Sequence, residues 1–234
     1  MALAHSPRIV TDGLVLCLDA GNTKSYPGSG TTWYDLSGNG NNGTLTNGPT
    51  YSDGTLTFDR SDDIVFCPPT NSIIGDSQST ITNIIVFKTT DTSNRMYASS
   101  LKRNTGASTL LSIDINSDNG GNFSSGKAGF LTSDGASHSW ITYNGGVNDG
   151  NWHFIGCVVD ASGRRLYIDG NLVASDATTL TTASGNTGTY TLGGFDTSNI
   201  LFGGSIALSL IYTKSLSTSE IQQNFNALRG RFGI

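Results

Sequence analysis

The stretch NDGNWHFIGCVVDASGRRLYIDGNLV, residues 148–173, holds two short apolar runs, each followed by a turn signal. In the first run both alternating sets of side chains are apolar: Trp152 and Phe154 belong to one set, Ile155 and Cys157 to the other. Successive residues of a strand point to opposite faces of a sheet, so a strand that is apolar on both faces is typical of a central, covered position. We therefore expect this run in the middle of a sheet, with Trp152 and Cys157 in the core.

The second run alternates instead. Leu166 and Ile168 point one way and Tyr167 the other, which predicts a strand with one face in water. Asp169 and Gly170 then form the dipeptide typical of a type I′ hairpin turn, which requires positive φ at both central residues. The whole stretch predicts a central strand followed by a hairpin.

Similar short segments recur along the chain between clusters of Gly, Asn, Asp and Ser. They cover residues 13–19, 54–59, 63–66, 79–89, 109–115, 153–160, 165–170, 189–195 and 204–213. This spacing predicts an all-β fold, an antiparallel β-sandwich. No change in composition divides the chain, so we expect an N-terminal arm over residues 1–12 and a single domain over 13–234, with the Gly/Asn-rich stretch 37–48 as an ordered surface loop.

One helix is expected near the end of the chain, at about residues 218–229. Ser217 and Glu220 have the spacing of a capping box, and Gly230 is placed to end the helix. The face expected to pack onto the sandwich comprises Ile221, Phe225 and Leu228.

Composition excludes several classes of partner. The net charge is −5 and the 13 Lys and Arg residues are spread thinly, so we expect no binding to nucleic acid or to an anionic membrane. No apolar run approaches the length of a membrane span, and the first residues lack the pattern of a signal peptide.

The widely spaced Cys17, Cys67 and Cys157 predict neither a disulfide framework nor a zinc site, and Cys17 and Cys157 lie in apolar runs typical of buried thiols.

Three groups of motifs resemble one family. They are GLVLCLDAGN, WYDLSGNGNNGTLTNGPTY and GTLTFDRSDDIV near the start, DGNWHFIGCVVDASGRRLYIDGNLV in the middle, and LGGF with FGGSIALSLIYTKSLSTSEIQQNF near the end. In this order, over roughly residues 13–226, they resemble the laminin-G-like, concanavalin A-like jelly roll. The resemblance implies a jelly-roll sandwich with the terminal helix packed on it.

The two ends of the chain resemble a narrower group. SPRIVTDGLVLCLDAGN and NFNALRGRFGI are similar to the termini of laminin-G-like proteins of tailed bacteriophages, especially those of marine bacteria and cyanobacteria. The resemblance implies a virion structural protein made in the host cytoplasm and exposed on the virion surface, as a head decoration, fibre or tail-associated adhesin. Its partners would be other capsid or tail subunits, in a homo-oligomer or multi-copy assembly, with host-surface glycans as a second ligand. The alternative is a carbohydrate-binding module or lectin whose main role is glycan recognition.

Catalysis is not expected from the sequence. Glucanases of this fold use a Glu-x-Asp-x-x-Glu strand, whereas Glu220 is the one glutamate here and belongs to the helix cap. Asp62 and Asp63 are expected in a loop or at a strand end, and on a strand they would point to opposite faces. Sialidase chemistry would need an Arg cluster or a Tyr/His set in one cleft, and no motif joins the histidines; we expect a structural place for His153. The sequence therefore predicts a protein that is not an enzyme.

No cofactor is required by this reading, although the resemblance allows a Ca²⁺ site. Asp19, Asn22, Asp35 and Asn39 offer hard oxygen ligands in Gly-rich segments, which suits Ca²⁺. However, many family members carry acidic residues where this chain has Ala207 and Leu208. The alternative is that these Asp and Asn side chains form turns and cap the backbone.

Glycan binding would use aromatic faces beside planar polar groups. The best such segment is SDGASHSWITYNGGVND, read as a loop, with His138, Trp140, Tyr143 and Asn144. For Trp140, burial in the core or in a protein interface is the alternative. A second aromatic loop, residues 31–42, contains Trp33, which we expect in the core.

Overall fold

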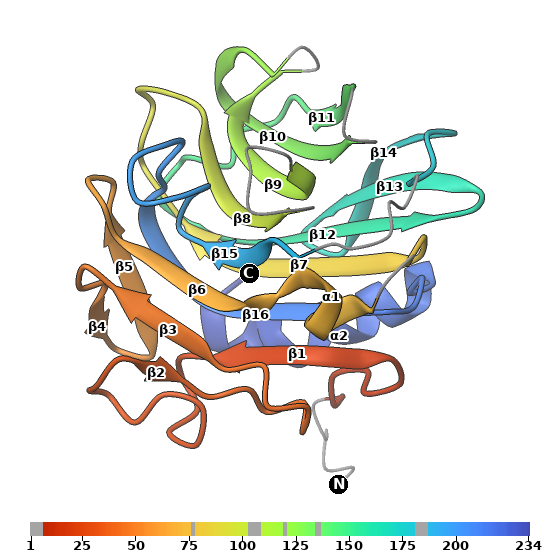
Figure 1. Ribbon diagram of the computed structural model, residues 1–234. Helices are drawn as coiled ribbons and strands as arrows, with labels where there is room; N and C mark the ends of the chain where they lie inside the picture. The colour runs from red at the N-terminus through yellow and green to blue at the C-terminus, as the bar shows by residue number, and fades with distance from the viewer. Residues whose placement is uncertain (1–6, 76–77, 103–108, 119–120, 134–136, 181–186) are drawn as a thin grey trace, which may run out of the picture.

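The computed structural model describes residues 7–75, 78–102, 109–118, 121–133, 137–180 and 187–234. Within these residues the chain forms two antiparallel sheets packed as a sandwich (Figure 1). The all-β prediction is confirmed.

One sheet, here called the back sheet, has the strand order β14-β13-β12-β7-β16-β5-β4, with β1 beside β16. Its strands are β1 (Leu14–Asp19), β4 (Thr50–Ser52), β5 (Thr55–Asp59), β7 (Ile81–Lys88), β12 (Trp152–Asp160), β13 (Gly163–Ile168), β14 (Asn171–Asp176) and β16 (Gly203–Tyr212). The long strand β16 pairs with β7 along one edge and with β5 and then β1 along the other.

The other sheet, the front sheet, has the order β11-β10-β9-β8-β15-β6-β3-β2. Its strands are β2 (Thr32–Trp33), β3 (Gly43–Thr46), β6 (Ile64–Pro69), β8 (Met96–Lys102), β9 (Thr109–Ser117), β10 (Phe123–Ser133), β11 (His138–Tyr143) and β15 (Thr189–Leu192). The short helix α1 (Thr70–Ile74) follows β6, and its Ile73 and Ile74 join the core between the sheets.

The first apolar run of residues 148–173 forms β12 inside the back sheet, as predicted, but Trp152, expected in the core, is only partly buried. β12 pairs with β7 on one side and β13 on the other. Its Ile155 and Cys157 belong to the core between the sheets, whereas Phe154 belongs to a second apolar cluster on the opposite face. The hairpin between β13 and β14 is also confirmed, because Asp169 and Gly170 both have positive φ, 50° and 77°.

The second apolar cluster is covered by helix α2 (Thr218–Phe232), which lies behind the back sheet in Figure 1. This explains one wrong prediction: the outer face of β13 is not in water, because Tyr167 is fully buried there and its hydroxyl is 3.1 Å from the Thr218 hydroxyl of the helix. The segment before β1 is held in the same layer, since Asn224 accepts a hydrogen bond from the Val10 amide. Residues 1–6 of the predicted N-terminal arm lie outside the described residues.

The capping box of Ser217 and Glu220 is present as predicted. The predicted end of α2 is wrong by one turn: Gly230 lies inside the helix, which continues to Phe232 and ends at Gly233 with a φ of 72°. Ile221, Leu228 and the polar Asn224 are buried against the sheet.

Several strands were not predicted. β3 lies within the expected loop 37–48, and β11 lies within the segment 133–149 that was read as a loop. β11 is an edge strand that pairs with β10 alone among the described strands, so polar and apolar residues both suit it. Trp33 and all three cysteines are buried and the cysteines are free thiols. Neither described helix is long and apolar enough to cross a membrane.

Candidate functional site

The outer face of the front sheet carries polar and aromatic side chains where its strands alternate. In β8, Met96 and Ala98 point into the core, so Tyr97 between them points outward. In β9, Ile113 and Ile115 point into the core, so Asp114 points outward. Tyr97 and Asp114 are paired across the two strands.

β11 adds two aromatic residues to this face. His138 and Trp140 are two residues apart, so they share a face, and their rings stack with centroids 5.8 Å apart. The Trp140 indole N–H donates a hydrogen bond of 3.0 Å to Asp114, and the Ser112 hydroxyl donates one of 2.5 Å to the other carboxylate oxygen. Trp140 is therefore neither in the core nor fully exposed: it covers a buried carboxylate on the outer face.

Asp114 is an unusual acid because it has no exposed surface. Burial raises its pKa to about 6, against the hydrogen bonds from Ser112 and Trp140 and the charge of Arg95, which lower it. This carboxyl group changes its charge close to neutral pH.

Two neighbouring hollows open on this face. The first, of about 380 Å³, is lined by Arg95, Tyr97, Thr109, His138, Phe195, Asp196, Asn199 and Ile200. The second, of about 370 Å³, is lined by Arg60, Asn94, Arg95, Phe123, Ser198, Ile200 and Leu201. Arg95 and Ile200 line both hollows, so we treat them as one front groove.

The loop of residues 195–201 forms one wall of the front groove. Asp196 accepts hydrogen bonds from the Ser198 amide and the Asn199 side chain, both at 2.9 Å. Burial raises the pKa of Asp196, but these hydrogen bonds outweigh it and hold the pKa below its ordinary value. Ile200 has a φ of 53°, which is strained for a β-branched residue, and its carbonyl accepts a hydrogen bond from the Tyr97 amide. Strain of this kind clusters at binding sites.

The four residues predicted to bind a ligand do not share one surface. His138 and Trp140 lie on the outer face, and His138 lines the front groove. Tyr143 packs against the core between the sheets, because it falls on the opposite side of β11. Asn144 is exposed beyond the end of that strand.

Sequence reasoning missed most of the groove. Arg95, Tyr97, Phe123 and Phe195 come from separate strands and loops that only the folded sheet brings together. One local signal was available: Ser112 and Asp114 alternate with apolar residues in the segment 109–115, which indicates a strand with one polar face.

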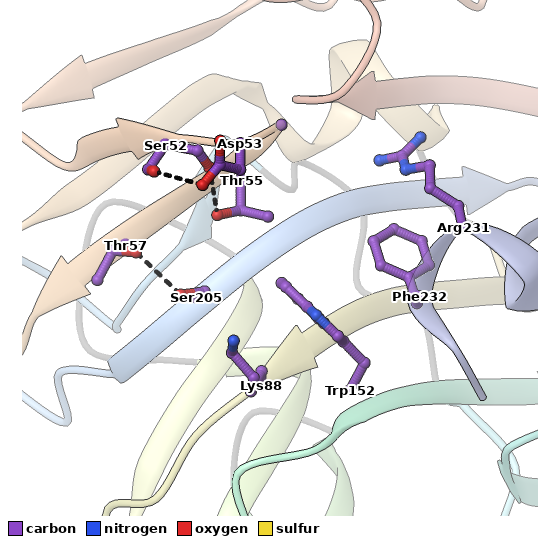
Figure 2. Close-up of a pocket in the computed structure, with 10 residues that line it drawn as sticks. Ser52, Asp53, Thr55, Thr57, Lys88, Trp152, Ser205, Arg231 and Phe232 are labelled. Atoms are coloured by element: carbon purple, nitrogen blue, oxygen red, sulfur yellow. Dashed lines mark hydrogen bonds between the residues drawn. The ribbon is translucent and has the colours of Figure 1, made fainter.

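A different hollow, of about 330 Å³, lies on the back sheet beyond the end of α2 (Figure 2). Figure 2 shows the Thr57 and Ser205 hydroxyls, 2.9 Å apart, beside Lys88 and Trp152. The Trp152 ring is already engaged, by the Lys88 ammonium at 5.1 Å and by the Phe232 ring, whose centroid also lies at 5.1 Å. Trp152 is thus half-buried at the rim of the apolar cluster.

The residues predicted to hold Ca²⁺ are engaged in other contacts. The Asp35 carboxylate accepts four hydrogen bonds, from the amides of Cys17, Ser37 and Asn41 and from the Ser37 hydroxyl. Asp19 forms an ion pair with Arg231 at 2.7 Å. A Ca²⁺ ion would have to displace these donors, so the arrangement of Asp19, Asn22 and Asp35 does not fit the ion.

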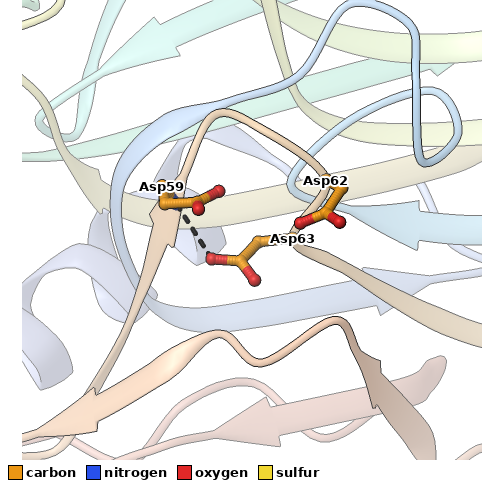
Figure 3. A group of neighbouring side chains, drawn as sticks. All are labelled: Asp59, Asp62 and Asp63. Carbon is orange, nitrogen blue, oxygen red and sulfur yellow. Dashed lines mark hydrogen bonds between the residues drawn. The ribbon is translucent and has the colours of Figure 1, made fainter.

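Asp59, Asp62 and Asp63, at the turn between β5 and β6, form a different acidic group (Figure 3). One carboxylate oxygen of each lies within 4.8 Å of the others, so Asp62 and Asp63 do converge, because they lie in a turn and not on a strand. Asp63 is buried and accepts a hydrogen bond from the Asp59 amide, and burial raises its pKa. These contacts account for the group as part of the turn.

His153 has the structural place expected of it. Its ring nitrogens lie 3.0 Å from Asp169 and 3.1 Å from Asp149, and Asp169 also accepts the Phe154 amide. Burial lowers the pKa of His153, but the hydrogen bonds and charges of the two aspartates outweigh it and raise the pKa above its ordinary value.

Comparison with known families gives one match. The model of the Concanavalin A-like lectin/glucanases superfamily, Laminin_G_3, matches residues 59–222. A comparison with curated protein sequences finds no match.

Solved structures with the same fold include an enzyme and a toxin domain. Trypanosoma rangeli sialidase, in complex with the inhibitor DANA, has a TM-score of 0.70 and 13% identity, covering 95% of this chain and 35% of the sialidase. The receptor-binding domain of botulinum neurotoxin C/D mosaic serotype has a TM-score of 0.66 and 16% identity, covering 92% of this chain and 51% of that one. This chain spans about a third of the sialidase and half of the toxin domain. At these identities the likeness is one of fold.

The prediction that the chain is not an enzyme is wrong. The fold matches about a third of a sialidase chain, and the superfamily includes glucanases as well as lectins. The prediction relied on a missing pair of glutamates, but sialidases use a tyrosine nucleophile, so that absence does not exclude glycoside hydrolysis. The structure also brings Arg95, Tyr97 and His138 into one hollow, which the sequence did not indicate.

Proposed function

This chain belongs to the Concanavalin A-like lectin/glucanases superfamily, and we propose that it binds oligosaccharides in the front groove. The observation that carries the proposal is the lining of the groove. Exposed Phe123 and His138 offer ring faces to the C–H surfaces of sugars, while Asn199 and Asp196 offer planar polar groups to their hydroxyls. The structural neighbours support this choice, since one is a sialidase in complex with sialic acid.

A glycan array tests the proposal. We expect saturable binding by the wild-type protein, and binding weaker by up to about tenfold for Phe123→Ala, because a stacked aromatic ring contributes roughly 0.5–1.5 kcal/mol. Tyr34→Ala is the matched control: Tyr34 is 46% exposed, close to the 48% of Phe123, and lies outside the groove. Failure to bind any glycan, or a loss with Tyr34→Ala and none with Phe123→Ala, would contradict the proposal.

The setting that we propose for this activity is the surface of a bacteriophage virion. The support is the resemblance of the two chain ends to laminin-G-like proteins of tailed phages. In this setting the chain binds other capsid or tail subunits in a multi-copy assembly, as a head decoration, fibre or adhesin, and the front groove contacts host-surface glycans. Cryo-electron microscopy of particles from the phage that encodes the chain would show repeated density of this shape on the surface; particles without the chain would overturn the setting. The alternative is a lectin outside a virion.

Glycoside hydrolysis in the same groove is a second candidate function. The observation in its favour is that Arg95, Tyr97 and His138 line one hollow. Burial raises the pKa of Tyr97, so its phenol would need a base to become a nucleophile. Release of free sugar from an array-positive glycan, lost with Tyr97→Phe, would support hydrolysis; intact glycan after prolonged incubation would exclude it for that ligand.

A further inference from the structure

Arg95 is held in place without a direct ion pair to any described carboxylate. Its NH1 group donates a hydrogen bond of 2.5 Å to the Gly121 carbonyl, and its guanidinium carbon lies 5.4 Å from the centre of the Tyr97 ring. No ion pair joins Arg95 to an acidic residue within the described part of the chain. Its Nε and NH2 groups, which form the other edge of the guanidinium, make no hydrogen bond to any described residue.

Arg95 differs in this from the other arginines that lie partly or fully inside the fold. Each of those contacts an aspartate: Arg60 pairs with Asp91, Arg164 with Asp176 and Arg165 with Asp160. A guanidinium inside a hollow is stabilised by a nearby negative charge. At Arg95 the charge acts on the buried Asp114 carboxyl, but no described carboxylate forms an ion pair with the guanidinium, so a ligand can take that place.

The position of Arg95 is built into the fold. Gly121 has a φ of 71°, and a Cβ atom there would lie 2.4 Å from the Trp140 ring and 2.9 Å from NH1 of Arg95. The absent side chain is what lets Arg95 reach the carbonyl beside Trp140. A pre-positioned guanidinium loses little side-chain entropy when it binds.

Arg95 also lies where the two hollows meet. Phe123 lines the hollow on one side of it and Phe195 the hollow on the other. A single sugar on Arg95 would therefore have an aromatic ring next to it in both directions, which suits a chain of sugars more than a monosaccharide.

We infer that the front groove binds an acidic oligosaccharide, with a sugar carboxylate on the Nε and NH2 edge of Arg95. A planar carboxylate matches this edge with two parallel hydrogen bonds. The inference rests on the proposed function and names the class of its ligand.

The test is an array of uronic-acid and sialic-acid oligosaccharides, each printed beside its carboxyl-reduced neutral counterpart and beside sulfated neutral sugars. Because a charge-assisted hydrogen bond contributes about 1.5–3 kcal/mol, we expect the acidic form to bind about 10- to 100-fold more tightly than its reduced counterpart. Arg95→Gln should remove this preference, and Arg95→Lys should restore it in part, because lysine keeps the charge but not the two-pronged geometry. Arg229→Gln, which makes the same charge change at an exposed site on α2, should leave it unchanged.

Each other result is decisive. Equal binding of acidic and reduced forms would overturn the inference while the proposed function stood. If Arg95→Gln still prefers the acidic form, Arg95 does not bind the carboxylate and the inference is wrong. If sulfated sugars bind more tightly than carboxylated ones, the inferred ligand class is wrong and the ligand group is a sulfate. If no glycan binds at all, the proposed function fails with the inference.

Discussion

Phe154 gives the sharpest test of how the helix is attached to the sandwich. Its side chain has no exposed surface, and its ring meets Phe225 of α2 edge to face, with centroids 5.8 Å apart. Truncating a fully buried phenylalanine removes its transfer free energy and leaves a cavity. We expect Phe154→Ala to lower the free energy of unfolding by about 3–5 kcal/mol.

The measurement is urea unfolding followed by tryptophan fluorescence and far-ultraviolet circular dichroism. Trp152→Ala is the internal comparison, because Trp152 lies two residues away on the same face but is half-buried at the rim of the cluster. We expect that substitution to cost less, about 1–2 kcal/mol. Phe154→Leu, which keeps most of the apolar volume, should cost about 1 kcal/mol. A loss below about 1 kcal/mol for Phe154→Ala, or equal losses for the two alanine variants, would refute the packing of α2 described above.

Three further predictions concern buried ionisable groups and one glycine. For Asp114 the folded-state pKa, about 6, exceeds the ordinary value, so its contribution to stability is present in acid and is lost as the pH rises through about 6. Asp114→Asn should therefore gain stability relative to wild type between pH 4 and 7, and parallel unfolding curves across that range would contradict this. For His153 the pKa is higher in the folded protein than its ordinary value. The contribution of this residue to stability is therefore complete at a pH below the ordinary pKa and is lost as the pH rises through the pKa of the folded state. In the same assay His153→Gln should thus lower the free energy of unfolding more at pH 5.5 than at pH 9. An equal loss at both pH values would show that the ion pairs of His153 do not stabilise the fold. Gly121→Ala should both lower the melting temperature and weaken acidic-glycan binding, because its Cβ would clash with Trp140. Unchanged binding would show that the contact of Arg95 with the Gly121 carbonyl does not position Arg95 for the ligand.

The central part of the fold was predictable because the hydrophobic effect leaves a periodic trace in the sequence. β12 is apolar on both faces since the other sheet covers one face and α2 the other, and that double coverage is visible as an unbroken apolar run. The same rule misled at β13. Tyr167 alternates with Leu166 as an exposed residue would, yet α2 covers it, and no local pattern shows which face a distant helix will cover.

The strands that line the groove were harder to predict for a physical reason. β8, β10 and β11 contain serine, threonine and glycine between their apolar residues, several of them buried, so their apolar pattern is diluted. The contacts that define the site are also long-range. Arg95 meets Gly121 across 26 positions, and Phe195 reaches the same hollow from a loop near the end of the chain. The sequence was interpreted as a loop at this segment, so Trp140 and Tyr143 were predicted to share one binding site. In a strand, alternation places these two residues on opposite faces, as the structure shows.

The most direct test of acidic-oligosaccharide binding is a crystal structure of the protein with the carboxylated oligosaccharide that binds most tightly on the array. We predict sugar density along the front groove, with the carboxylate within hydrogen-bond distance of Nε and NH2 of Arg95 and neighbouring sugars against Phe123 and Phe195. Density in the hollow beside Trp152 and Phe232, or a sugar in the groove whose carboxylate faces solvent, would contradict the account.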